Sequence, residues 1–308
     1  MTELAGLSLN PVADFEAMTE FPFMVNALWA GTIVAVLAGA IGWFMVLRRQ
    51  AFAGHTLSVI AFPGAAAAAL AGLPLAVGYF GACALGALGL AAVSRAGEGG
   101  SGEADESAAI GTLQALALGL GFLFVNLYSG QLASLESLLF GTFLGITTGQ
   151  VQTLLWVAVA ALVVLAAIGR PLLFASLDGA VARAAGVPTR LLGAAFLLLL
   201  GLAVAATAQI TGALLVFALL VTPAATAQQL TARPGLGIAL SVALALLVTW
   251  VGLTIAFFSP YPVGFWVTSL SFGLYVAVRL ALEAGRRWAP RGEGTSGRAA
   301  AGAGAGAA

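Results

Sequence analysis

Continuous apolar runs of about 20 residues recur along this chain between residues 23 and 282, and only 8% of all residues are charged. A run of about 20 apolar residues, wound as an α-helix, crosses a hydrocarbon core of about 30 Å. The runs are rich in Leu and Ala and do not alternate over about ten residues, as the strands of a membrane barrel do. A soluble domain would carry about 25% charged residues. We therefore predict an all-α polytopic membrane protein.

The apolar runs predict nine membrane-spanning helices. They cover residues 23–47, 57–72, 74–93, 108–127, 151–168, 191–209, 212–230, 236–258 and 263–282. Together they form a transmembrane domain of residues 23–283, preceded by an external segment of residues 1–22. That segment has no basic residue, unlike a secretory signal, so we expect the first span to be retained. Residues 284–308 are rich in Gly, Ala and Arg, and we expect a disordered cytoplasmic tail.

The basic residues predict how the chain is oriented in the membrane. All twelve are arginine, and they fall on one side if nine spans alternate from an external amino terminus. Because basic residues in short loops favour the cytoplasm, we expect the amino terminus outside and the carboxyl terminus inside. The twelve are Arg48, Arg49, Arg95, Arg170, Arg183, Arg190, Arg233, Arg279, Arg286, Arg287, Arg291 and Arg298.

Motifs of soluble enzymes are absent from the sequence. It has no GxxxxGKS/T phosphate loop, no HExxH and no GxSxG. One histidine and one cysteine, Cys83, cannot build a metal cage or an internal disulfide. The spans hold almost no ionisable side chains, which argues against a proton-driven carrier and an intramembrane hydrolase. We therefore expect no catalytic residue and no ATPase activity in this chain.

The stretch of residues 48–72 is the first candidate for a translocation path. Two arginines end one apolar run, the single histidine His55 follows, and Pro63-Gly64 interrupt the next run. Proline removes a helical hydrogen bond, and a carbonyl freed in this way is tolerated at membrane depth only when it is buried or lines a cavity. Two arginines at a span end, a histidine that can bind a metal ion and an interrupted helix together suggest a translocation path.

Other polar and small residues have simpler interpretations. The pair Thr222-Pro223 also frees a helical carbonyl. A kink that serves helix packing is the alternative explanation both for this proline and for Pro63. The small residues 64–69 are expected to permit close helix contact, within the chain or across a dimer. Gln114 and Gln209 lie near span ends and are expected to hydrogen-bond to neighbouring helices. The acidic run after Arg95 is expected to be a solvated loop.

The loop of residues 170–190 contains a predicted short helix with a signal at each end. Asp178 suits the N-cap, residues 179–185 make two turns, Gly186 suits the left-handed position after the helix, and Pro188 prevents its continuation. A capped helix held between two spans presents a rigid knob on which a separate motor protein can push. An ordinary capped loop helix remains the alternative.

Several motifs, in order, resemble the membrane permease of bacterial zinc/manganese ABC transporters. They are FPFMVNALWAG, LRRQAFAGHTLS, AFPGAAAA, DESAAIGTLQALAL, LLFGTFLGIT, LDGAVARAAGVP, LLVFALLVTPAATAQQL and YPVGFWVTSLSFGLY. The resemblance implies a homodimeric permease in the bacterial plasma membrane that moves zinc or manganese by alternating access. It implies an extracellular solute-binding protein that delivers the metal and a cytoplasmic ATPase that hydrolyses ATP. It also makes residues 178–186, with Asp178, Ala182, Arg183 and Gly186, the coupling helix that docks into the ATPase.

One departure from the family pattern concerns the metal ligands. The family has Gly-Asp followed four residues later by His, whereas this chain has Gly54-His55 and then Val59. His55 can still ligate zinc or manganese, but the pair is reduced to one ligand unless a second subunit or a nearby hydroxyl contributes. His55 could instead be a polar group that hydrogen-bonds to a neighbouring helix.

Three further residues complete the predicted transport path. Thr56 and Ser58 carry the hydroxyls next to the histidine, and Glu136 is the one acidic residue of an apolar external segment. Glu136 would receive metal from the binding protein, or it simply contacts water. Two other functions stay open: a permease for a metal chelate or cofactor, and a self-contained secondary carrier. The only other partner that we expect is membrane lipid, and we expect no nucleic acid.

Overall fold

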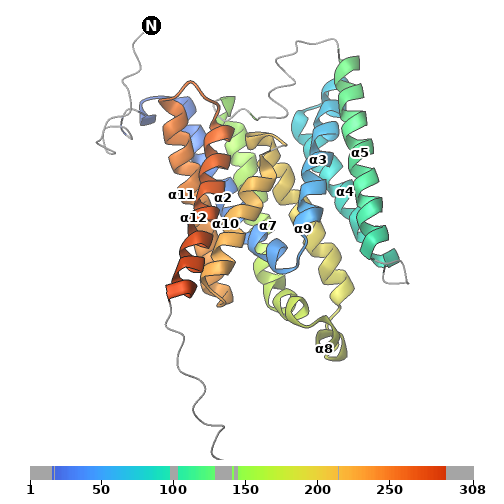
Figure 1. The fold of residues 1–308 in the computed structure, drawn as a ribbon. Helices are drawn as coiled ribbons and strands as arrows, with labels where there is room; N and C mark the ends of the chain where they lie inside the picture. Colours follow the sequence, from blue (N-terminus) through green and yellow to red (C-terminus); the bar gives the residue numbers. More distant parts are fainter. Residues whose placement is uncertain are drawn as a thin grey trace, which may run out of the picture.

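The computed structural model describes residues 16, 18–97, 103–128, 141, 145–213 and 215–288, and this part of the chain forms ten helices (Figure 1). Labels follow Figure 1. The helices are α2 (Pro22–Leu47), α3 (Ala51–Leu70), α4 (Leu75–Gly97), α5 (Glu103–Leu127), α7 (Thr148–Leu177), α8 (Gly179–Ala184), α9 (Thr189–Thr211), α10 (Val216–Leu230), α11 (Pro234–Phe257) and α12 (Val263–Trp288).

Each of the nine predicted apolar runs corresponds to one helix, and eight of these helices are long and apolar enough to cross a membrane. The exception is α10, which has 15 residues. At 1.5 Å per residue it reaches about 22 Å, short of the hydrocarbon core. The prediction of a span over residues 212–230 was wrong at its start. Gly212, with a φ of 76°, ends α9, and the next helix begins only at Val216.

Other predicted boundaries also differ from the structure. Helix α12 continues to Trp288, so residues 284–288 of the predicted disordered tail are helical. The second span begins at Ala51 rather than at residue 57, so His55 lies inside α3. The fifth continues past residue 168 and through Pro171 to Leu177, because a long helix tolerates the loss of one hydrogen bond. Glu103, Asp105 and Glu106 of the acidic run predicted as a loop instead lie in α5, whereas Glu98 lies outside the described residues.

Helix α2 lies at the centre of the bundle and packs against α7, α9, α10 and α11. Small residues allow these close approaches: a Cβ atom on Gly42 would overlap the backbone carbonyl of Leu220 on α10. The hydroxyl of Ser241 on α11 donates a hydrogen bond of 2.8 Å to the carbonyl of Gly39. Close packing and interhelical hydrogen bonds are what hold membrane helices together, because lipid provides no hydrophobic driving force between them.

Helices α3, α4 and α5 form a second group beside this centre. Gly64 of α3 faces α4 so closely that a Cβ atom would overlap Ala82 and the backbone of Gly78, which confirms the close contact predicted for the small residues. The amide of Gln114 on α5 donates to the Thr56 hydroxyl of α3 at 2.8 Å, also as predicted. The same prediction for Gln209 was wrong, because its amide donates to a carbonyl of its own helix, α9.

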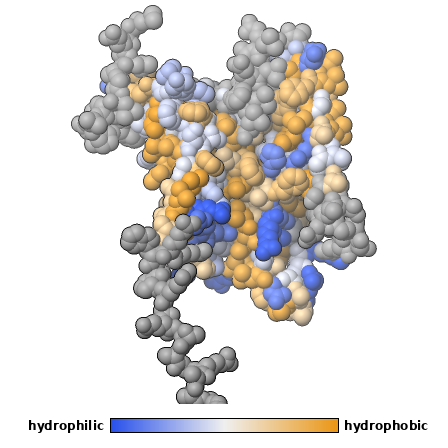
Figure 2. Space-filling view, viewed as in Figure 1, coloured by the Kyte–Doolittle hydropathy of each residue, from blue (hydrophilic) through white to orange (hydrophobic). Residues whose placement is uncertain are grey.

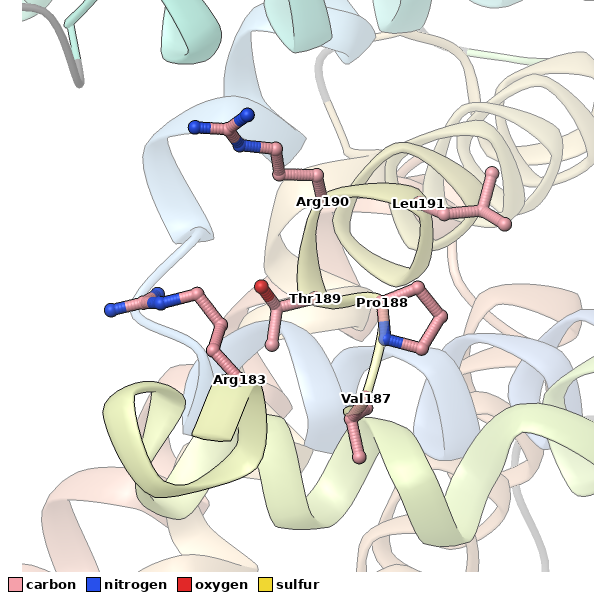
Figure 3. Close-up of a pocket in the computed structure, with 6 residues that line it drawn as sticks. All are labelled: Arg183, Val187, Pro188, Thr189, Arg190 and Leu191. Atoms are coloured by element: carbon pink, nitrogen blue, oxygen red, sulfur yellow. The ribbon is translucent and has the colours of Figure 1, made fainter. Parts of the chain in front are cut away.

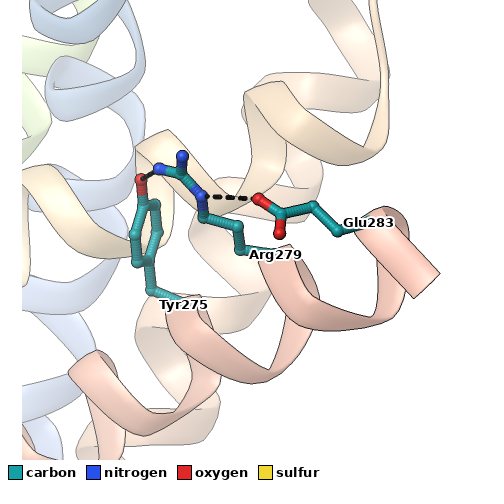
Figure 4. A network of polar contacts seen from close by, with 3 residues as sticks. All are labelled: Tyr275, Arg279 and Glu283. Atoms are coloured by element: carbon teal, nitrogen blue, oxygen red, sulfur yellow. Dashed lines mark hydrogen bonds and ion pairs between the residues drawn. The ribbon is translucent and has the colours of Figure 1, made fainter. Parts of the chain in front are cut away.

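The face shown in Figure 2 is largely apolar, and the larger hydrophilic patches on it lie toward the lower half of the view. Large apolar side chains such as Leu85 and Trp156 are each 72% exposed. On α12 the ionisable residues form a ladder (Figure 4): Arg279 pairs with Glu283 at 3.3 Å and donates to the Tyr275 hydroxyl at 3.4 Å. Such pairing reduces the cost of a charge within a membrane-spanning helix.

Candidate functional site

His55 lies in the second turn of α3 and faces α10. Its half-buried imidazole meets the ring of Phe217, with a centroid distance of 5.2 Å and an interplanar angle of 67°. Phe217 is 162 positions further along the chain, and no local sequence signal singles it out. The contact places the histidine where α3 and α10 pack against each other.

The Nδ1 atom of His55 is buried and has no hydrogen-bond partner among the described residues. Buried polar atoms in proteins are nearly always paired, so an orphan calls for an explanation. Three other buried atoms share this state, namely Trp43 Nε1 and the hydroxyls of Thr249 and Ser271. Of the four groups, imidazole is the common metal ligand, whereas the indole N–H can only donate. The side chain makes no hydrogen bond to a neighbouring helix in the described structure.

The hydroxyls of Thr56 and Ser58 are not directed to the imidazole. The Thr56 hydroxyl donates to the carbonyl of Phe52 at 2.9 Å and accepts from Gln114 of α5. The Ser58 hydroxyl donates to the carbonyl of His55 at 2.7 Å. Both residues are buried, and their hydrogen bonds stay with the α3 backbone and α5. The structure therefore separates these two predicted path residues from the histidine side chain.

Two prolines free backbone carbonyls on the helices that meet at His55. Val59 lies one turn after His55 on the same face of α3, and its carbonyl has no helical donor because position 63 is a proline. Pro223 leaves the carbonyl of Leu219 without a helical donor on α10 in the same way. The two helices that meet at the imidazole thus each carry one freed carbonyl.

No group of three or more His, Cys, Asp or Glu side chains gathers in the parts of the chain that the structure describes. Glu136 lies outside these described residues, so its role stays a prediction. Among the described residues, an ion at His55 would therefore not meet a cluster of three such side-chain ligands.

The short helix α8 begins at a side-chain cap. Asp178 Oδ1 accepts hydrogen bonds from the backbone N–H groups of Ala180 at 3.0 Å and Val181 at 2.9 Å. These bonds satisfy two of the N–H groups that a helix start leaves free. The predicted N-cap is confirmed.

The other end of α8 is closed by the backbone. Gly186 adopts a φ of 81°, its N–H donates to the carbonyl of Arg183, and the N–H of Val187 donates to the carbonyl of Ala182, both at 3.0 Å. This is the left-handed ending that glycine favours. Ala182 is buried while Arg183 is exposed. The capped knob predicted over residues 178–186 is thus present, and Figure 1 places it at one end of the bundle, opposite the start of α2.

Comparisons with known proteins agree with one another. A family profile described as the ABC 3 transport family matches residues 20–281. The "Manganese transport system membrane protein MntC" of Halalkalibacterium halodurans is 31% identical over 219 residues, which cover 71% of this chain and 73% of that protein. The "Chelated iron transport system membrane protein YfeC" of Yersinia pestis is 29% identical, with 77% and 79% covered.

A solved structure has the same arrangement of helices. The structure described as "PsaBC from Streptococcus pneumoniae in complex with Fab" superposes with a TM-score of 0.77 and 26% sequence identity. The superposition covers 87% of this chain and 94% of the other. Nearly all of the described helical bundle is therefore shared with that protein.

Proposed function

This chain belongs to the ABC 3 transport family, and we propose that it is the membrane permease of an ABC importer for a divalent metal ion, Mn²⁺ in the first place and Fe²⁺ in the second. The names of the matched relatives specify manganese and chelated iron. The relatives reported above give no support to zinc, the other metal expected from the sequence. The permease does not hydrolyse ATP, and a separate ATPase subunit drives it.

The observation that supports a metal path is the buried, unpartnered Nδ1 of His55. Its ring lies between α3 and α10, two helices in each of which a proline leaves one backbone carbonyl without a helical donor. Imidazole and carbonyl oxygens are ligands that Mn²⁺ and Fe²⁺ accept. We propose that the ion passes this point in transit, with His55 as its one side-chain ligand.

The same proposal assigns the rest of the assembly. The amino terminus lies outside and the arginine-rich end of the bundle lies in the cytoplasm, in accordance with the positions of the basic residues. Two copies of the chain form the path, and an extracellular binding protein delivers the ion, with Glu136 on its route. ATP binding draws the two α8 helices together, and the spans rock from an outward-open to an inward-open state.

The test is ATP-driven uptake of Mn²⁺, Fe²⁺ and Zn²⁺ by vesicles that contain the chain, its ATPase and its binding protein. We compare the wild type with His55→Ala and His55→Asp, because aspartate restores an oxygen ligand at the same position and alanine restores none. Uptake of Mn²⁺ should be lost with alanine and recovered with aspartate. Thr56→Val is the matched control: its hydroxyl bonds to α5 and the α3 backbone, so uptake should persist.

Three results would contradict parts of this proposal. Equal uptake by wild type and His55→Ala would remove His55 from the path but leave the permease in place. Uptake of a metal chelate in preference to the free ion would replace the ion permease by a chelate permease, a second candidate that the name of the iron relative supports. Uptake by vesicles without the ATPase would instead identify a self-contained carrier.

A further inference from the structure

Three arginines line one cavity at the end of the bundle where α8 lies. Arg48 follows α2, Arg183 belongs to α8, and Arg190 lies in the first turn of α9. The cavity has a volume of about 230 Å³, and no acidic residue is part of its described lining. Because a cavity of this size is smaller than most pockets for organic ligands, it suits a compact anionic group.

Arg48 brings a half-buried charge to this cavity without a counter-charge. Its Nε donates to Gln50 Oε1 at 3.2 Å and its Nη1 donates to the Ser176 hydroxyl at 3.1 Å, so both partners are neutral. Its guanidinium also lies 5.4 Å from the ring centre of Phe196. Burial lowers the pKa of this guanidinium, and no carboxylate in the described part of the chain pairs with it. A buried charge usually has an opposite charge beside it.

A second hollow adjoins the first and shares Arg183 and Arg190 with it, as well as Thr189. Its volume is about 780 Å³, and its other lining residues are Val187, Pro188 and Leu191. Figure 3 shows the two guanidinium groups extending to one side, while Leu191 points to the other. Leu191 is 66% exposed. The lining of this hollow thus includes both charged and apolar residues.

We propose that these joined hollows bind an anionic membrane phospholipid, with its phosphate among Arg48, Arg183 and Arg190 and an acyl chain along Leu191. Arginine forks match the oxygen geometry of phosphate. Basic pockets at the cytoplasmic ends of membrane helices are suited to anionic head groups. A free phosphate would use only the arginines, whereas a phospholipid also covers the exposed apolar side chains. The proposal goes beyond the transported ion and does not depend on which metal moves.

A lipid bound at this site would also affect how α8 contacts the ATPase. Arg183 lies on α8, and Arg48, which follows α2, is hydrogen-bonded to Ser176 near the end of α7. A phosphate bound to both arginines would therefore connect the proposed coupling helix to the ends of α2 and α7. Bound lipid should therefore hold α8 in the position from which it contacts the ATPase.

The experiment titrates the full chain, in complex with its ATPase, with phosphatidylglycerol, phosphatidylcholine or inorganic phosphate, and follows bound lipid by native mass spectrometry. Phosphatidylglycerol should bind more tightly than phosphatidylcholine, and Arg190→Gln should weaken it by about fivefold, the effect expected of one arginine near an anionic lipid. Arg233→Gln is the matched control. It removes an exposed arginine expected on the same side of the membrane but outside both hollows, and binding should not change.

Arg48→Gln should weaken binding as well, and circular dichroism checks its fold because this residue also joins α2 to α7. Equal binding of the two lipids, or equal binding by Arg190→Gln and Arg233→Gln, would overturn the proposal. Inorganic phosphate that competes at the same affinity as phosphatidylglycerol would show a phosphate site and overturn the lipid assignment. Lipid that binds the isolated chain but not the complex would show that the ATPase occupies the site instead.

Discussion

Removal of the Asp178 carboxylate tests whether the rigidity of α8 is what transmits force from the ATPase. Asp178→Ala deletes the acceptor of two backbone hydrogen bonds, those from Ala180 and Val181. Loss of an N-cap costs about 1 kcal/mol, which lowers the equilibrium constant for forming the helix about fivefold. A helix of six residues has no reserve against this loss, because short helices are marginal without their caps and packing.

The assay measures the affinity of the permease for its ATPase and the ATP hydrolysis that metal-loaded binding protein stimulates. We expect Asp178→Ala to weaken both by about fivefold. Asp178→Asn is the control, because asparagine caps a helix as well as aspartate does but carries no charge. It should behave as the wild type. If asparagine fails as alanine does, the charge of Asp178 acts on the ATPase directly, and the argument from capping is refuted. Wild-type behaviour of Asp178→Ala would equally refute it.

Three further substitutions test the path and the packing around it. Val59→His places a second imidazole one turn after His55. Titration calorimetry should show that the variant binds Mn²⁺ on the order of tenfold more tightly, which corresponds to about 1.4 kcal/mol. Unchanged affinity would mean that this face of α3 meets no ion. Pro63→Ala restores a donor to the Val59 carbonyl, so thermal stability should rise while Mn²⁺ uptake falls; Pro171→Ala, the same change in α7, should leave uptake intact. Gly64→Ala overlaps α4 and should cost about 1–3 kcal/mol in thermal unfolding, whereas Gly81→Ala, which meets open space, should cost little.

The sequence predicted α8 well because local chemistry determines this helix. The cap at Asp178, the left-handed Gly186 and the following proline each act within a few residues. The local sequence is therefore sufficient to predict both ends of this helix. The apolar runs predicted the spans for the same reason. The break between α9 and α10 was predicted, but the start of α10 was placed four residues too early. The conformation of Gly212, which ends α9, depends on a backbone dihedral that the apolar composition does not specify, and α10 begins only at Val216.

The candidate site was only partly predictable because it depends on contacts between distant segments. His55 could be selected as the single histidine, and helical periodicity placed Val59 on its face. The contact with Phe217 and the bond from Gln114 to Thr56 join segments far apart in the chain. A single sequence contains no signal for such pairs. Adjacent positions on a helix differ by about 100° in direction, which is why the side chains of His55 and Thr56, two neighbouring candidates, lie on different sides of α3.

One imidazole and a few carbonyl oxygens suit this path because the ion has to leave it again. A second strong ligand would deepen the energy well, and the same free energy would then oppose release into the cytoplasm. Neutral oxygens offer Mn²⁺ a ligand that it accepts without adding charge to the site. A chain with Val59 in place of a histidine should therefore bind more weakly and turn over faster. Val59→His should reverse both properties together, and a variant that bound more tightly without slower uptake would show that ion release does not limit transport.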